Sequence, residues 1–253
     1  MTKLTFLGTG TSQGVPMIGC GCDVCRSSDP RDKRLRASVL VEHEGLTILV
    51  DAGPDFRQQM LRADVSHVDA ILLTHNHKDH TGGLDDIRAF NYLENKASQI
   101  YCEKYVEDAL RMEYSYAFAE KKYPGAPEWD VHIIDENPFS INGVEIIPIR
   151  GMHYKLPVLG YRFGNIAYCT DMNHIPEEEF AKLQGLDHFV INCVKYGKHI
   201  SHYSLEEAVA VAQRVGAKHS WLTHLSHRLP CYETLAAKLP AGILPAYDGL
   251  ILE

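Results

Sequence analysis

The chain has 253 residues, of which 45% are hydrophobic and 23% are charged, and its formal net charge is −8. This composition is typical of an ordinary folded protein and excludes a disordered, collagen-like or coiled-coil chain. The excess of acidic over basic residues gives no support to a long nucleic acid as an obligatory partner. No apolar run reaches the length of a membrane span and the first residues lack a signal peptide, so we expect a cytoplasmic protein with no membrane partner.

Short apolar runs rich in β-branched residues predict strands, and segments with helical periodicity separate them. In chain order the predicted strands are residues 4–7, 38–41, 46–50, 70–74, 144–149, 158–163, 166–170, 189–192 and 221–223. The predicted helices are residues 55–63, 84–94, 104–122, 176–183, 204–215 and 232–238. The tight-turn pairs Asn142-Gly143 and Gly164-Asn165 predict partly antiparallel sheets. With no repeat or linker, we expect one α/β domain over residues 1–253, in which sheets are flanked by helices.

A dense group of potential metal ligands follows the predicted strand at residues 70–74. The run His75-Asn-His77-Lys-Asp79-His80 places four such side chains within six residues. Imidazole and carboxylate groups are common ligands of divalent metals. In an extended segment alternate side chains share a face, so His75, His77 and Asp79 are expected to converge while His80 is offset toward a second point. This pattern predicts two metal ions rather than one.

Two metals need more ligands than one loop supplies. Three further candidates each follow an apolar, strand-like run: His153, Asp171 and His224. Ligands at strand ends around one rim are how a rigid scaffold presents a site. Taken singly, each residue is equally compatible with a surface or hydrogen-bonded role, so the inference depends on their joint pattern.

In this order the residues resemble the metallo-β-lactamase superfamily, whose pattern is a strand Asp, then H-x-H-x-D-H, a downstream His, an Asp and a final His. The strand Asp is Asp51, and the resemblance extends over nearly the whole chain. It implies an αββα sandwich of two mixed β-sheets flanked by helices, with the metals at one edge. It also implies that Asp51 orients the histidines of the metal loop. The implied ligands are His75, His77 and His153 for one metal, Asp79, His80 and His224 for the other, and Asp171 as the bridge.

Other segments resemble the PhnP branch of the superfamily, phosphodiesterases linked to phosphonate breakdown and similar to ribonucleases Z. They are Leu7-Gly-Thr-Gly-Thr-Ser-Gln-Gly-Val-Pro16, Cys20-Gly-Cys22-Asp-Val-Cys25 and Leu222-Thr-His224-Leu-Ser-His227. By this resemblance Cys20, Cys22, Cys25 and His227 form a structural zinc site, and Cys₃His is a known tetrahedral zinc set. The alternatives are a redox pair at Cys22 and Cys25, or plain reduced thiols.

The PhnP branch also implies a general acid on the loop before a late helix. By its spacing to the capping-box start at Ser204 this is His202, and His199 is the alternative. The segment from about 91 to 130 is rich in aromatic residues and is predicted to be a helical insert. It could roof the site and stack a base or sugar, but helical spacing equally indicates packing or burial in a homodimer.

The sequence therefore predicts a dinuclear metal-dependent hydrolase of small phosphodiesters, by resemblance of the cyclic ribosyl phosphate or cyclic nucleotide type. A hydroxide bridging the metals, held by Asp79 and Asp171, is the expected nucleophile, and His202 the acid. The catalytic ligands fit Zn²⁺ or Mn²⁺, and the thiolate cluster fits one structural Zn²⁺. Only a few cations, such as Arg150 and Lys155, lie near the ligands in the sequence. This number suits a substrate with one or two phosphates.

Three alternatives to this function stay open. A ribonuclease Z-like RNA endonuclease would share the metal site, but the sequence shows no lysine-rich arm for tRNA. A lactone or thioester hydrolase would use the same metals on a carbonyl substrate. A non-catalytic metal-binding protein would keep the ligands without turnover, although a complete ligand set together with a candidate acid argues against it.

Overall fold

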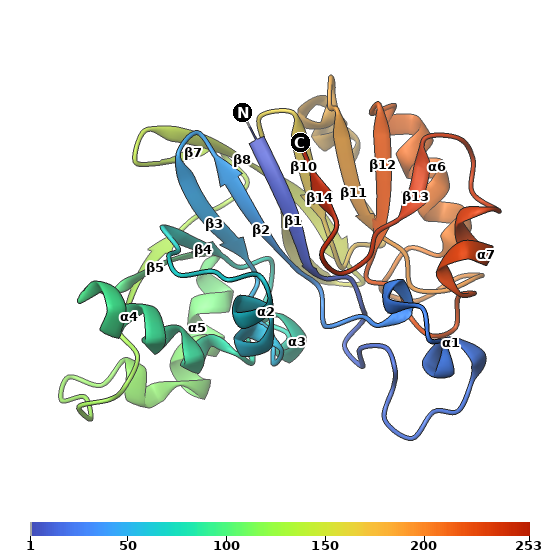
Figure 1. The fold of residues 1–253 in the computed structure, drawn as a ribbon. Coiled ribbons are helices and arrows are strands. Elements are labelled where there is room, and N and C mark those ends of the chain that lie inside the picture. The colour runs from blue at the N-terminus through green and yellow to red at the C-terminus, as the bar shows by residue number, and fades with distance from the viewer. Residues whose placement is uncertain (1) are drawn as a thin grey trace.

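The computed structural model describes residues 2–253, in which two seven-stranded sheets are stacked face to face (Figure 1). The first sheet has the strand order β14 (Ile251–Leu252), β1 (Thr2–Gly8), β2 (Ser38–His43), β3 (Leu46–Val50), β4 (Ala70–Leu72), β5 (Ser98–Cys102) and β6 (Trp129–Ile133). The second has the order β13 (Ile243–Pro245), β12 (His219–Thr223), β11 (His188–Asn192), β10 (Ile166–Cys169), β9 (Leu156–Phe163), β8 (Val144–His153) and β7 (Phe139–Ile141).

Each sheet combines antiparallel and parallel pairs. In the first sheet β14, β1, β2 and β3 pair antiparallel, and β3 to β6 pair parallel. In the second, β7 to β10 pair antiparallel and β10 to β13 pair parallel. Because the carboxyl ends of parallel strands meet at one edge of a sheet, the loops that follow them are brought together there.

Three buried apolar clusters hold these layers together. The cluster between the sheets contains Phe6, Ile48 and Tyr161, all fully buried. Two further clusters join the outer face of each sheet to its helices. Burying a side chain of this size contributes about 1.5–3 kcal/mol, so the stacked layers, rather than any single helix, supply most of the stability.

Helices cover both outer faces of the pair of sheets (Figure 1). The first sheet carries α2 (Phe56–Arg62), a 3₁₀ helix (Leu84–Ile87), α4 (Arg88–Glu94) and α5 (Lys104–Glu113). The second carries a 3₁₀ helix (Glu177–Leu183), α6 (Leu205–Val215) and α7 (Tyr232–Ala236). Shorter turns are α1 (Asp23–Arg26), α3 (Lys78–Thr81) and 3₁₀ helices at Pro30–Asp32 and Ser115–Ala117. Within residues 2–253, none of the helices combines the length and the apolar character needed to cross a membrane.

The predicted fold class, two mixed sheets flanked by helices, is confirmed. The segment 91–130, expected to be a helical insert, is helical only in part, because α5 ends at Glu113 and strands β5 and β6 complete the first sheet. The helix α5 ends at Glu113, with Tyr114 as its C-cap, and a 3₁₀ turn at Ser115–Ala117 follows it. The strands β5, β6, β7, β13 and β14 were not predicted.

Candidate metal centre

Two groups of potential metal ligands lie at the edge of the sheets where several strands end. Within each group the ligand atoms lie within 4.8 Å of one another. The first group consists of His75, His77 and His153, and the second of Asp79, His80, Asp171 and His224. The groups adjoin, because the rings of His75 and His80 are only 4.3 Å apart between centroids.

The helix α3 decides how the metal loop divides its side chains. It begins at Lys78, directly after the extended His77, so the backbone is no longer extended where Asp79 occurs. Asp79 therefore lies with His80 and not with His75 and His77, and the expectation from strand alternation is wrong. The sets implied by the family resemblance coincide in space with the two observed groups, while their binding of metal stays a prediction.

Asp51 lies fully buried behind the metal loop and orients two of its histidines. Its Oδ2 accepts hydrogen bonds from His80 Nδ1 at 2.7 Å and from the Thr74 hydroxyl at 2.9 Å. That hydroxyl lies 2.9 Å from Nδ1 of His75, and the Thr74 amide donates to Asp51 Oδ1. With both Nδ1 atoms engaged, the Nε2 lone pairs of His75 and His80 face the centre, which is the orientation that metal ligation requires.

The atoms that face the centre fit a bound cation. Within the described residues, the buried Nε2 atoms of His75, His80 and His224 have no hydrogen-bond partner. Asp171 Oδ2 lies 3.2 Å from His80 Nε2, and its Oδ1 lies 3.2 Å from His224 Nε2. Buried polar atoms are nearly always satisfied, so unpartnered imidazole nitrogens that converge with carboxylates are the donor set of a divalent metal site.

The pKa shifts at the centre also favour a bound cation. Burial raises the pKa of Asp171, but the neighbouring His224 and His80 outweigh it and hold that pKa well below its usual value. Burial lowers the pKa of His80, but the carboxylates of Asp171, Asp79 and Asp51 outweigh it and raise that pKa well above its usual value. Without metal, a proton on His80 thus balances carboxylates that would otherwise be buried unpaired.

Three residues around this centre have backbone conformations that side chains other than glycine rarely adopt. Asp51, Asp171 and His224 have φ values of 63°, 56° and 55°. Each such conformation costs about 1–3 kcal/mol and persists only where the surrounding structure enforces it. Asn192 fixes the backbone next to Asp171. Its side chain accepts a hydrogen bond from the Met172 amide at 2.8 Å and donates one to the Met172 carbonyl at 2.9 Å. Strain of this kind typically gathers at functional sites.

His202 lies at the centre and His199 lies behind it. Nδ1 of His202 is 3.7 Å from Asp171 Oδ1, and its ring centroid is 4.6 Å from that of His153 and 4.7 Å from that of His224. Burial, together with charge on His224, lowers the pKa of His202 to about 3, so the ring is neutral at neutral pH. The His199 ring is 5.0 Å from that of His202 and belongs to neither ligand group.

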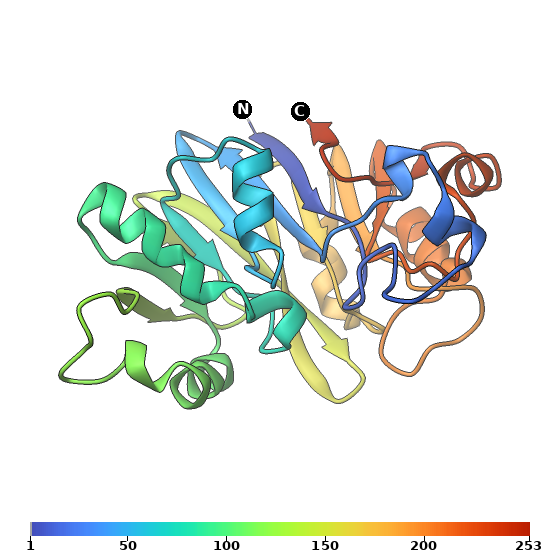
Figure 2. The same cartoon turned by 60° about the horizontal axis from the view of Figure 1, so that its bottom comes forward.

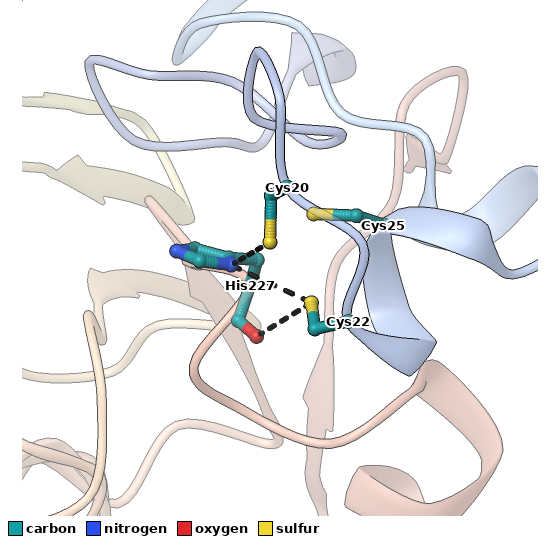
Figure 3. A group of neighbouring side chains, drawn as sticks. All are labelled: Cys20, Cys22, Cys25 and His227. Carbon is teal, nitrogen blue, oxygen red and sulfur yellow. Dashed lines mark hydrogen bonds between the residues drawn. The ribbon is translucent and has the colours of Figure 1, made fainter.

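The cysteine cluster forms a separate site near α1. Cys20, Cys22 and Cys25 point toward one another and toward the His227 ring (Figure 3). The His227 Nδ1 atom is 3.2 Å from Cys20 Sγ and 3.5 Å from Cys22 Sγ. A hydrogen bond from the Cys25 amide and another from His227 lower the pKa of Cys22 to about 6, whereas burial raises the pKa of Cys25 to about 11. The four ligands have the chemistry of a closed zinc site.

Two aromatic residues of the segment 91–130, Tyr114 and Trp129, pack against neighbouring elements. The Tyr114 hydroxyl donates to the Thr81 carbonyl at 2.8 Å, and the Tyr114 and Trp129 rings meet edge to face at 5.2 Å. Tyr114 therefore ties this segment to the end of α3, which carries two of the ligands. These contacts favour the packing interpretation over base stacking.

Two basic residues have other roles than the sequence indicated. Arg150 binds both oxygens of Glu103 at 2.6 and 2.7 Å and also Glu136, so it is not free for a phosphate. Arg34, a type of residue that is seldom buried, is buried here and donates to the Ala246 carbonyl. Sequence reasoning overlooked these pairings because the partners lie far away along the chain.

Three residues that support the site were not among the predicted site residues: Thr74, Asn192 and Asn173, whose side chain accepts from the Tyr154 amide next to His153. Their only sequence signal is that each lies at or just beyond the end of a strand, within a few residues of a ligand or of its loop. That position is too common to single them out, since polar residues at strand ends occur throughout most folds.

Comparison with known proteins gives a consistent picture. A family model described as a beta-lactamase superfamily domain matches residues 47–225. A crystal structure described as a new diphosphatase from the PhnP family has a TM-score of 0.93 and 40% identity, covering 100% of this chain and 98% of that chain. Zinc-bound PqqB from Methylobacterium extorquens has a TM-score of 0.80 at 18% identity, covering 99% of both chains, which shows a shared fold.

A curated relative from Porphyromonas gingivalis (strain ATCC BAA-308 / W83), named octanoyltransferase, is 42% identical over 98% of this chain but only 51% of its own length. The chain thus spans about half the length of the first curated relatives that it matches.

Proposed function

The chain belongs to the beta-lactamase superfamily, in its PhnP-like branch of metal-dependent hydrolases, and on that premise we propose that it hydrolyses small phosphodiesters at a dinuclear metal centre. The observation that carries the proposal is the position of Asp171. Its two carboxylate oxygens each lie 3.2 Å from a histidine of the second group, and it also belongs to a cluster with His153 of the first. A carboxylate shared in this way suits a bridging ligand.

The residues have separate roles in this proposal. His75, His77 and His153 would hold one divalent ion, and Asp79, His80 and His224 the other, with either Zn²⁺ or Mn²⁺ as the metal. When bound, such ions supply Lewis acidity and lower the pKa of bound water. Asp79 and Asp171 position the attacking water, and Asp51 keeps the His80 ring turned toward the centre. The cysteine cluster would hold one structural Zn²⁺.

His202 is the proposed general acid. Its Nδ1 lies 3.7 Å from Asp171 Oδ1 and its side chain is 12% exposed, so it borders the same space as the ligands. Its pKa of about 3 leaves the ring unprotonated at neutral pH. An anionic substrate beside it would favour the protonated ring, which could then donate to the leaving oxygen. His199 is farther from the ligand groups and is the weaker alternative.

Charge favours a small substrate over RNA. Arg150 is paired with Glu103 and Glu136, and Arg36 with Asp55, so these cations are already neutralised. Lys155 is an exposed cation next to the histidines of the first group. Lys195 and Arg228 lie near His199, and these few cations suit one or two phosphates, whereas an RNA footprint needs many on one face.

The octanoyltransferase name of one relative raises the question of acyl chemistry. This chain matches only half of that protein, so the named activity could reside in the other half. The same metals could also act on a thioester or lactone carbonyl. Acyl substrates therefore belong in the test of function.

The test compares kcat/KM for small cyclic and alkyl phosphodiesters, phosphomonoesters, a lactone, an octanoyl thioester and precursor tRNA, with Zn²⁺ or Mn²⁺ at matched salt. We expect the small diesters to be turned over best, and Asp171→Asn to abolish that turnover. A higher kcat/KM for precursor tRNA that falls steeply with salt would make the protein a ribonuclease. A higher value for the thioester or lactone would make it an acyl hydrolase.

A further inference from the structure

A pocket with apolar walls opens beside the first group of ligands. It is a cavity of about 490 Å³. One wall comes from Tyr154 at the tip of the β8–β9 hairpin, which projects beyond the body of the sheet and is drawn in yellow in Figure 2. Another comes from Ile200 in the loop before α6. The lining consists of His77, His153, Tyr154, Lys155, Leu156, Ile200 and Ser201.

Tyr154 occupies a position that disfavours a tyrosine. His153 pairs with Leu156, so Tyr154 and Lys155 alone form the turn, and Tyr154 has a φ of 59°. Tight turns of this kind prefer glycine or asparagine, because a bulky side chain is strained at positive φ. The β7–β8 and β9–β10 hairpins follow that preference with Asn142-Gly143 and Gly164. The β2–β3 hairpin has Glu44 at the corresponding position with a φ of 49°, so among these four turns the one that borders the ligands is distinguished by its aromatic ring, which points to a function for that ring.

Asn173 fixes the two walls relative to each other. Its Oδ1 accepts a hydrogen bond from the Tyr154 amide at 3.0 Å, and its Nδ2 donates to the Ile200 carbonyl at 3.0 Å. His153 Nδ1 donates to the Ser201 carbonyl at 2.8 Å, which ties a ligand to the same loop. The pocket is therefore built on the site itself, and its walls are held by side chains two residues or fewer from proposed ligands.

Both apolar walls are open to solvent. Tyr154 is 52% exposed and Ile200 is 65% exposed. An exposed aromatic ring facing an aliphatic side chain is suited to a flat apolar group between them, and stacking on one ring is worth roughly 1–3 kcal/mol. The Lys155 ammonium lies 5.4 Å from the Tyr154 ring centroid, where it can meet a carbonyl or anionic substituent on that group.

We propose that this pocket is a subsite for a planar aromatic group of the substrate, a nucleobase or an aryl ester, stacked on Tyr154 while the phosphorus centre lies at the metal ligands. The proposal rests on the phosphodiesterase function and narrows its substrates to diesters with one aromatic substituent. Tyr154 is then a residue that determines specificity, and Asn173 one that positions it.

The test measures binding rather than turnover. Calorimetry on protein saturated with Zn²⁺ compares phenylphosphonate, methylphosphonate and octylphosphonate, which share an anionic head and differ in the attached group. We expect phenylphosphonate to bind about tenfold more tightly than methylphosphonate, in line with the stacking energy. Tyr154→Ala should remove this preference and Tyr154→Phe should keep it. Tyr123→Ala, at a tyrosine 79% exposed and outside the pocket lining, is the matched control and should change nothing.

Three outcomes overturn the subsite. They are equal binding of the phenyl and methyl compounds, equal weakening of both by Tyr154→Ala, and tighter binding of the octyl than of the phenyl compound, which would make the pocket a site for an alkyl chain. Failure of the proposed function gives a different result from failure of the subsite. In that case the protein does not hydrolyse diesters but still binds phenylphosphonate more tightly than methylphosphonate. Diester turnover without that preference rejects the subsite alone.

Discussion

Asp51→Asn isolates the contribution of a residue that touches no substrate. Asp51 accepts hydrogen bonds from the His80 ring, the Thr74 hydroxyl and the Thr74 amide, at 2.7, 2.9 and 2.9 Å. An asparagine presents an amide donor where one of these donors points, so at least one hydrogen bond is lost and the histidine rings lose their fixed direction. Outer carboxylates of this kind are worth about 10–100-fold in metal affinity. That range corresponds to about 1.4–2.7 kcal/mol.

The fold of the metal-free protein should suffer less than metal binding does. Burial raises the pKa of Asp51, which means that the ionised carboxylate is costly in its place. Removing the charge relieves that cost and offsets part of the lost hydrogen bonding. We therefore expect a smaller change in the free energy of unfolding of the metal-free chain than in the free energy of metal binding.

The assay is a zinc titration in competition with a chelating indicator, paired with urea unfolding of the metal-free protein. Asp248→Asn is the matched control, since Asp248 is also buried and accepts from the Leu35 amide and the Thr9 hydroxyl, away from the ligands. It should lower stability without lowering zinc affinity. If Asp51→Asn binds zinc as tightly as the unchanged protein, or if Asp248→Asn loses as much affinity, the assigned role of Asp51 is wrong.

Three further predictions concern other parts of the molecule. Cys22→Ser should lose one zinc per chain while the catalytic metals stay bound, as read by elemental analysis; unchanged zinc content would contradict the structural site. His202→Ala should keep its metals but slow hydrolysis of an alkyl diester by about 10²- to 10⁴-fold, and it should slow hydrolysis of a p-nitrophenyl diester far less. His199→Ala is the control. Equal slowing on both substrates would show that His202 is not the general acid. In the metal-free protein His202 has a folded pKa of about 3, below its unfolded value of 6.5, so the unfolded state binds the extra proton between these pH values. The stability of the unchanged protein relative to His202→Ala should thus fall as the pH drops from 6.5 toward 3, by up to about 1.4 kcal/mol per pH unit in urea unfolding, and a flat difference would show that His202 is not buried as a neutral ring.

The fold class and the set of candidate ligands could be predicted from local sequence patterns. Apolar runs marked nine of the strands, because a strand buried on one or both faces has a strong local signature. The ligand candidates were visible because few local roles explain four imidazole and carboxylate groups in the six residues from His75 to His80. The match to a whole family pattern then separated His153, Asp171 and His224 from other polar residues at strand ends.

The division of these residues between the two ligand groups, and the contacts around them, could be seen only in the folded structure. The helix α3 turns Asp79 toward His80, which strand alternation alone could not show. Arg150 is neutralised by Glu103, 47 residues away in the sequence, so a cation beside a ligand is not a phosphate site. Tyr154 and Ile200 become two walls of one pocket through the side chain of Asn173. Contacts between residues so far apart depend on how the layers pack, and local spacing carries no record of that packing.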